Sequence, residues 1–415
     1  MAEITRRIGL SLGADLCWPI CYEEILRRWN PRLRVGADVV RFEVERVTIE
    51  PFDLRAPCRY DLVLDRLTHW YHLSREWIKK AVLMDGLYVL NNPWSIQSME
   101  KQTTYAAMMH LGLPVPDTWM IPPKEYDPLP DLRPTLERYA KLFDLGEVGR
   151  NIGYPHFMKP YDGGAWVAVS RIDDEQALRD AYENSGKRVM HLQKAVRNFD
   201  LFVRALGVGP QVRFIRYDPQ APLHERYLLD RDFLSPEEKG CLTDMTLCIN
   251  SFFGWDFNSC EVLRKDDTFY PIDFANACPD SQVTSLHYHF AWLVKAMLRW
   301  SLFCAATARP MRRNLDWAPY YQARSRKLPY RESLRAYGEI AKARFDEERF
   351  EEFCSKHFTA LDDVAWEFFG SERAKEAVRA KVEAIFPEHE HERFTEHFWE
   401  RIQMWRRDEE KNQPA

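Results

Sequence analysis

The spacing of apolar residues changes twice along this chain of 415 residues, and each change restricts the fold. Over residues 1–92, strand-like segments alternate with helix-like ones. The strand-like segments are RRIGLSLGAD, YDLVLDRL and LYVLNN, and the helix-like ones are PICYEEILRRWN and SREWIKKAVLMDG. Strands that alternate with helices form a largely parallel sheet. We therefore predict a small open α/β domain that ends near Asn92.

Two further regions follow with different periods. Residues 93–286 begin with a helix that stops at Gly112, and from residue 155 onward they contain alternating strands such as HFMKPY, VMHLQKAV and PQVRFIRYD. This alternation indicates an antiparallel sheet with one covered face. Residues 287–415 have apolar residues at helical spacing. The predicted fold class is thus an α/β domain, an α+β region with antiparallel sheets, and a helical C-terminal region.

The composition argues against two classes of binding partner, nucleic acids and membranes. The formal net charge of −5 argues against binding duplex nucleic acid by charge alone, so no nucleic-acid partner is expected. The nine cysteines include no CxxC pair and are predicted to be reduced thiols. We find no signal peptide and no apolar stretch of membrane-spanning length. We therefore expect a cytoplasmic protein without a membrane partner.

Two lysines stand in settings suited to phosphate. Lys159 precedes Pro160 in MKPYDGGAWVAVSRI, where Gly163 and Gly164 would let the backbone approach an anion. The same Asp-Gly-Gly run is also a hairpin turn, so the segment by itself fits both interpretations. Lys101 stands near the start of the helix in SIQSMEKQTTYAAMMHLG and points either at an anion or into solvent.

A pair of acids suggests a metal. In GWDFNSCEVLRKDDTFYPIDFANACPDS, Glu261 and Asp273 are expected on two antiparallel strands joined by the polar turn RKDD, with Asn276 just beyond. Mg²⁺ takes oxygen ligands from one or two carboxylates plus phosphate oxygens. The alternative is an ordinary turn.

Arginines form the third group of candidate site residues. Arg204, Arg213 and Arg216 lie on two strands of a predicted hairpin in DLFVRALGVGPQVRFIRYD. Arg204 and Arg213 either face a common anion or pair with surface acids.

Taken in order, these segments resemble the ATP-grasp superfamily, in particular its glutathione synthetase and ribosomal-protein glutamate ligase branch, from about residue 8 to residue 285. NNPWSIQSMEKQ is similar to the region of the first phosphate lysine, Lys101, and PHFMKPYDGG to that of the second, Lys159, with Gly163 and Gly164 starting the loop over the phosphates. The resemblance implies that adenine is bordered by residues of HLQKAV, namely Gln193, Lys194 and Val196.

The later motifs complete the resemblance. NFDLFVRALGVG implies that Asp200 and Arg204 are the acid and arginine after the hinge, with Arg204 acting beside the phosphate. Glu261, Asp273 and Asn276 resemble the magnesium ligands. The sequence departs from the family at the bulky Trp166, where small residues are usual, and at Asp273-Phe274-Ala275-Asn276, one residue longer than usual.

The resemblance implies an ATP-dependent, ADP-forming ligase that uses ATP and Mg²⁺. ATP phosphorylates a small-molecule or peptide carboxylate, and an amine or thiol then displaces phosphate. A kinase of the same fold and a non-catalytic nucleotide-binding protein are the alternatives. Asp15, Arg66 and His69, near strand ends of the first domain, are candidates for the acceptor site.

The helical region lies outside the resemblance. Its tryptophans are expected in a core or in an interface between copies of the chain: Trp292, Trp300, Trp366, Trp399 and Trp405. His389, His391 and His397 form either a metal site or a solvated face.

Overall fold

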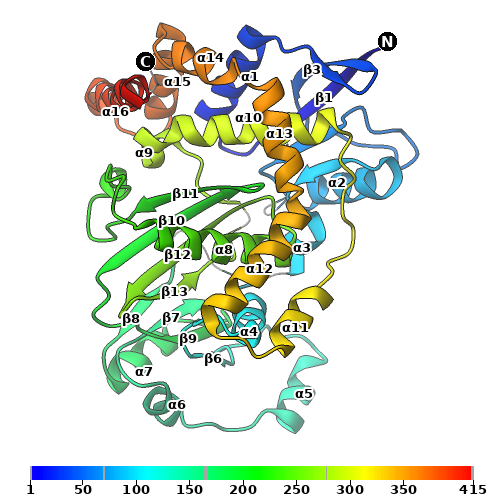
Figure 1. The fold of residues 1–415 in the computed structure, drawn as a ribbon. Coiled ribbons are helices and arrows are strands. Elements are labelled where there is room, and N and C mark those ends of the chain that lie inside the picture. Colours follow the sequence, from blue (N-terminus) through cyan, green and yellow to red (C-terminus); the bar gives the residue numbers. More distant parts are fainter. Residues whose placement is uncertain (1, 69–70, 99, 163–166, 277, 413–415) are drawn as a thin grey trace. The chain divides into compact units, whose positions relative to one another are not determined.

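The computed structural model describes residues 2–68, 71–98, 100–162, 167–276 and 278–412. It divides into two compact units. The first comprises Met1–Ser98, Arg204–Ser259 and Ala277–Ala415, and the second comprises Met99–Val203 and Cys260–Asn276. The predicted fold class is confirmed, since the structure combines a largely parallel sheet, antiparallel sheets and a helical C-terminal region (Figure 1). The predicted domain boundaries at residues 92 and 286 stay predictions.

The first unit begins with a five-stranded sheet of order β2-β3-β1-β4-β5. Its strands are β1 (Glu3–Ser11), β2 (Leu33–Val35), β3 (Asp38–Arg46), β4 (Leu62–Asp65) and β5 (Tyr88–Leu90). All neighbouring pairs are parallel except β2 with β3. The parallel arrangement agrees with the predicted α/β domain.

The hairpin of β2 and β3 is missing from the sequence-based prediction. The segment DVVRFEVER of β3 places charged residues at alternate positions, and only Val40 is fully buried in it. With so little apolar burial the strand gives a weak hydrophobic signal, although it pairs with β1 over eight residues.

Helices from both ends of the chain pack on this sheet. Val63 and Val89 form a core with Ile78, Ala81 and Val82 of α2 (His72–Asp85). The C-terminal helix α10 (Phe290–Ala306) contacts β1, β4 and α1 (Cys17–Trp29). The helical region is therefore part of the same compact unit as the first ninety residues.

The other helices of this unit extend that core. Helices α14 (Leu361–Phe368) and α15 (Glu372–Glu383) contact α1, and α16 (His391–Asn412) contacts α15 (Figure 1). Trp300 and Trp405 are buried, as expected for core residues. The remaining elements of the unit are α3 (Pro93–Ser98), α8 (Pro236–Phe253), α9 (Val283–Leu286), α11 (Ala318–Ser325), α12 (Tyr330–Phe345), α13 (Glu347–His357), α14 (Leu361–Phe368), α15 (Glu372–Glu383), α16 (His391–Asn412) and the 3-10 turns Leu223–Glu225, His287–His289 and Glu388–Glu390.

A second sheet has the order β11-β10-β12-β13. It consists of β10 (Leu201–Val208), β11 (Gln211–Arg216), β12 (Phe257–Lys265) and β13 (Thr268–Asp273). The division into units falls within β10 and β12, so β13 belongs to the second unit and β11 to the first.

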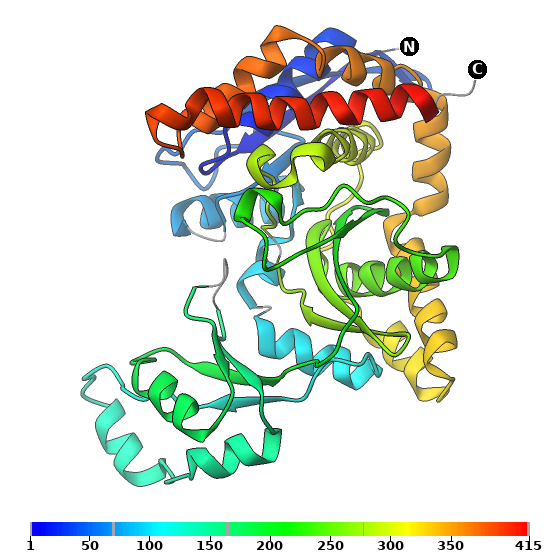
Figure 2. The ribbon, with the colours of Figure 1, turned by 90° about the vertical axis from the view of Figure 1, so that its left-hand side faces the viewer.

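The second unit also has a four-stranded antiparallel sheet, of order β6-β9-β7-β8. Its elements are β6 (Thr118–Ile121), β7 (His156–Pro160), β8 (Ser170–Ile172), β9 (Met190–Lys194), α4 (Lys101–Leu111), α5 (Leu132–Tyr139), α6 (Leu145–Ile152) and α7 (Glu175–Glu183). Helices α6 and α7 cover one face of the sheet (Figure 2), and their core includes Met158, Met190 and Leu192.

All nine cysteines are free thiols, as predicted. Among the helices of the described residues, none is both long enough and apolar enough to cross a membrane.

Candidate functional site

Strand alternation in the second unit separates an apolar face from a polar one. Met158 of β7 and Leu192 of β9 are paired and face α6 and α7. Because successive side chains of a strand point to opposite faces, Lys159 and His191, which are also paired, lie on the other face. Gln193 lies on that face too, and its Oε1 accepts a hydrogen bond of 2.8 Å from Lys159 Nζ. The polar face thus presents a buried lysine held by a glutamine.

Helix α4 brings a second lysine to the same unit. Lys101 is the first residue of α4, as the sequence predicted, and only 8% of it is exposed. Its Nζ lies 2.5 Å from Asp273 Oδ2. One turn later, Tyr105 donates a 2.9 Å hydrogen bond to the carbonyl of Ile272. This contact fixes α4 against the end of β13 and so holds Lys101 beside Asp273.

The two predicted acids are direct neighbours. Glu261 of β12 pairs with Asp273 of β13 in an antiparallel register. The turn between these strands contains Asp266 and Asp267, both with positive φ, in agreement with the predicted polar hairpin. A register irregularity follows Glu261, and both carboxylates are half-buried.

Burial and like charge shape the electrostatics of this face. Burial, with a smaller contribution from Lys101, lowers the pKa of Lys159 to about 8. Burial together with Lys159 and Lys101 lowers the pKa of His191 to about 3, so its ring is neutral at pH 7. Asp273 and Glu261 act in the opposite direction on Lys159 and favour its charged form. The two lysines and two carboxylates therefore form one electrostatically coupled group.

His191 is the residue of this group that the sequence interpretation missed. It is fully buried, and its Nδ1 lies 2.8 Å from Gln102 Nε2. An amide NH₂ only donates, so Nδ1 accepts and the ring proton sits on Nε2. Within the described part of the chain, Nε2 has no hydrogen-bond partner. The sequence shows that His191 stands in the strand-like segment HLQK. That it lies opposite Lys159 follows only from the strand register.

These residues fit a metal held jointly with phosphate oxygens. Among the described residues, no group of three or more His, Cys, Asp or Glu side chains could hold a metal by itself. Mg²⁺ is commonly bound by one or two carboxylates plus substrate phosphates. Glu261 and Asp273 supply two carboxylates beside two lysines. The Nε2–H of His191, which has no partner among the described residues, adds a buried donor suited to an anion. Asn276 is half-buried beyond β13.

The other predicted nucleotide residues are less closely connected to this group. Lys194 is exposed, with its Nζ 3.8 Å from Asp117, and Val196 is half-buried after β9. Asp200 pairs with Arg264 at 2.5 Å, and this contact lowers the pKa of the Asp200 carboxyl. The roles of Lys194, Val196 and Asp200 stay predictions.

The predicted arginines belong to the first unit. The guanidinium of Arg204 lies 5.8 Å from the ring centres of both Tyr217 and Tyr227. Arg213 contacts Nδ1 of His289 at 3.5 Å, and Arg216 pairs with Asp230 at 3.1 Å. A phosphate role for Arg204 stays a prediction.

Four residues singled out in the sequence lie outside the described residues. They are His69, Gly163, Gly164 and Trp166.

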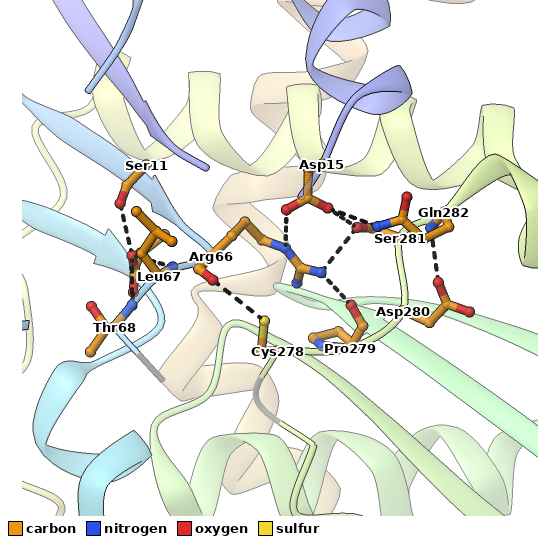
Figure 3. Close-up of polar contacts among 11 residues, drawn as sticks. Ser11, Asp15, Arg66, Leu67, Thr68, Cys278, Pro279, Asp280, Ser281 and Gln282 are labelled. Atoms are coloured by element: carbon orange, nitrogen blue, oxygen red, sulfur yellow. Dashed lines mark hydrogen bonds and ion pairs between the residues drawn. The ribbon is translucent and has the colours of Figure 1, made fainter. Parts of the chain in front are cut away.

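Asp15 and Arg66 form a buried network in the first unit (Figure 3). Arg66 Nε donates to Asp15 at 3.3 Å, and Arg66 NH2 donates to the carbonyl of Pro279 and to Ser281 Oγ. Ser281 and Gln282 both donate to Asp15 Oδ1. Burial alone would raise the pKa of Asp15, but Arg66 and the hydrogen bonds lower it. A role of Asp15 and Arg66 in acceptor binding stays a prediction.

Comparisons with known proteins fall into two groups. No protein-family model matches the chain, and no curated protein matches it either. Solved structures do show similarity. The RimK-domain ATP-grasp protein from Sphaerobacter thermophilus is similar with a TM-score of 0.47 and 14% identity, over 71% of this chain and 99% of that one.

Two further structures complete the comparison. D-alanine–D-alanine ligase from Bacillus anthracis, in complex with ATP, has a TM-score of 0.49 and 13% identity, over 78% of this chain and all of that one. The macrocyclase MdnC from Microcystis aeruginosa, bound to its precursor peptide MdnA, has a TM-score of 0.46 and 11% identity, over 72% of this chain and all of that one.

Proposed function

We propose that this chain is an ATP-dependent, ADP-forming carboxylate–amine or carboxylate–thiol ligase of the ATP-grasp type. The observation that supports the proposal is the coupled group of Lys101, Lys159, Glu261 and Asp273 in the second unit. The sequence motifs assign the two lysines to phosphate and the two acids to a metal. Its charges suit a triphosphate and a divalent cation rather than either alone.

The proposed reaction has two steps. A carboxylate oxygen of the first substrate attacks the γ-phosphorus of ATP, and the bond to ADP breaks. The amine or thiol of the second substrate then attacks the acyl carbon of the acylphosphate, and phosphate leaves with the electron pair of the C–O bond. Bound Mg²⁺ would neutralise phosphate charge, and Glu261, Asp273 and Asn276 are the residues proposed to hold it.

The chain's own residues would orient and neutralise the triphosphate. Lys159 and Lys101 supply positive charge from buried positions, where electrostatic interactions are stronger than in water. Gln193 fixes the Lys159 ammonium, and Tyr105 fixes the helix that carries Lys101. Arg204 is proposed to act on the transferred phosphoryl group, as the sequence motif implies.

Release of ADP and phosphate, with identification of the product, tests the proposal. Amino acids and peptides are screened in pairs with ATP and Mg²⁺, and release is expected only when both a carboxylate and a nucleophile are present. Lys159→Ala is expected to abolish release. Lys187→Ala, which removes an exposed lysine of the same unit paired with Asp127, serves as the control and should retain it.

Other results would overturn the proposal. A stable phosphoester as product means a kinase. Nucleotide binding without turnover under every substrate mixture means a non-catalytic nucleotide-binding protein. Unchanged turnover in Lys159→Ala would show that the coupled group around Lys159 is not the active site.

A further inference from the structure

One segment of the first unit is strongly basic, although the chain as a whole is acidic. Residues 309–344 run from the end of α10 through α11 and α12, and they contain ten lysines and arginines but three acids, a net charge of +7. Since the whole chain has a net charge of −5, the other residues together carry −12. We call residues 309–344 the basic arm, which Figure 1 shows in yellow to light orange, with α12 packed on α8.

This separation of charge changes what the composition implies. The expectation that no nucleic acid binds rested on the net charge of the whole chain, which averages the basic arm with an acidic remainder. At physiological salt, charges farther apart than about 8 Å are largely screened from each other, so a polyanion responds to the local charge rather than to the total. The basic arm therefore has the charge that such a partner requires.

Many cations of the basic arm are free to bind an external anion. Five of them are exposed, and their side chains have neither an ion pair nor a hydrogen bond to any of the described residues: Arg312, Arg313, Arg326, Lys327 and Arg335. Partial burial, together with the like charges of Arg344 and Arg309, lowers the pKa of Arg312. An anion bound beside Arg312 would relieve this repulsion.

Two further arginines support the same surface. Arg309 donates a 2.6 Å hydrogen bond to the carbonyl of Arg344, which joins the two ends of the basic arm. Arg331 pairs with Glu237, and both side chains are more than half exposed. Because exposed ion pairs contribute little free energy, a phosphate can replace Glu237 beside Arg331 at small cost.

The exposed surface of the basic arm favours a nucleic acid over a protein partner. Protein interfaces have a buried apolar core, but Tyr321, at 37% exposed, is the one exposed large apolar side chain of the arm, all of whose residues are described. Tyr321 stands three residues before Arg324 on α11, so the two side chains lie on the same face of that helix. Single strands are bound in this way, by aromatic rings that stack on bases beside cations that hold the phosphates.

We propose that the basic arm binds single-stranded nucleic acid, with its exposed cations on the phosphates and Tyr321 stacked on a base. Eight of its ten cations are arginines, whose planar fork of donors fits phosphate oxygens. A single strand fits better than a duplex, because its bases are free to stack and because the acidic remainder of the chain opposes a broad contact with a duplex. The proposal is independent of the proposed ligase function.

Fluorescence anisotropy tests this proposal on the full-length chain without ATP or Mg²⁺. The probes are fluorescein-labelled oligouridylate and oligothymidylate of about 15 nucleotides, which distinguish RNA from DNA as the bound strand. If the five exposed cations contact phosphates, a plot of the logarithm of the association constant against the logarithm of the salt concentration should have a slope of about −3.5. A slope near zero, or no binding of either probe, would overturn the proposal.

Variants of exposed cations locate the site. The double variant Arg326→Gln/Lys327→Gln should change the slope to about −2 and weaken binding about fiftyfold at roughly 0.05 M salt. The matched control is Lys141→Gln/Arg188→Gln, which removes an exposed lysine and an exposed arginine of the second unit and should change neither value. Tyr321→Ala should weaken binding about tenfold and leave the slope unchanged, because it removes stacking but no charge. Equal losses in the two double variants would contradict the assignment to the basic arm.

Three further measurements separate the alternatives. Lys159→Ala should bind the strands as the wild type does, and loss of binding in this variant would move the site to the second unit and overturn the proposal. Tighter binding of poly-L-glutamate would mean an acidic polypeptide partner, and tighter binding of a duplex of the same length would mean a double-stranded one; either result overturns the proposal. None of these measurements requires ADP release, so the basic arm and the ligase reaction are tested separately.

Discussion

If Lys159 contacts the triphosphate, as the proposed function requires, its lowered pKa makes nucleotide binding depend on pH in a defined direction. Burial lowers this pKa from the ordinary 10.5 to about 8, so the free protein loses the Lys159 charge as pH rises through 8. The protonated fraction then falls from about nine-tenths at pH 7 to about one-tenth at pH 9. If only the charged lysine holds the triphosphate, the association constant for MgATP falls about tenfold over this interval.

Isothermal titration of MgATP at pH 7, 8 and 9, without a second substrate, measures this effect. Lys159→Arg is the matched control, because a guanidinium stays charged throughout and also reports any titration of the ligand itself. The wild-type affinity should fall relative to that of the variant. An equal pH dependence in both proteins would refute the proposed contact between Lys159 and phosphate.

Two further predictions concern buried titratable groups. His191 has a pKa of about 3 in the fold and an ordinary value of 6.5, so the folded protein loses stability as pH falls below 6.5. His191→Phe should reduce the loss between pH 7.5 and pH 5 by about 2 kcal/mol in urea unfolding, and an unchanged loss would contradict this. Arg66→Met leaves the buried Asp15 carboxylate without its cation and should destabilise the protein by about 3–5 kcal/mol, whereas adding Asp15→Asn should restore part of that stability in thermal unfolding.

Local features of the site could be predicted from the sequence. The positions of Lys101 at a helix start and of Lys159 on a strand follow from periodicity, and so does the RKDD turn that pairs Glu261 with Asp273. Each depends on a few neighbouring residues, whose backbone preferences are strong.

Contacts between distant segments could not be predicted in the same way. The 2.5 Å approach of Lys101 to Asp273 joins residues 172 positions apart, and it depends on how α4 packs against β13. The place of His191 opposite Lys159 depends on strand register, since a slip of one residue would turn its side chain to the other face. Periodicity predicts that α10 is an apolar helix, but it does not predict that this helix packs against β1.

For the proposed function, the charge balance of the site predicts that nucleotide and metal bind together. Lys101 and Lys159 offset Glu261 and Asp273, so a triphosphate without metal would bring negative charge towards two carboxylates. At about 7 Å and an effective dielectric constant of about 20, one unit charge contributes about 2 kcal/mol, or roughly thirtyfold in affinity. Asp273→Asn, which also frees Lys101 from its ion pair, should therefore bind metal-free ATP more tightly than the wild type and MgATP more weakly. Asp267→Asn, in the exposed turn of the same hairpin, should change neither value. Equal affinities of the Asp273→Asn variant and the wild type for both forms of the nucleotide would show that Asp273 does not face phosphate or metal.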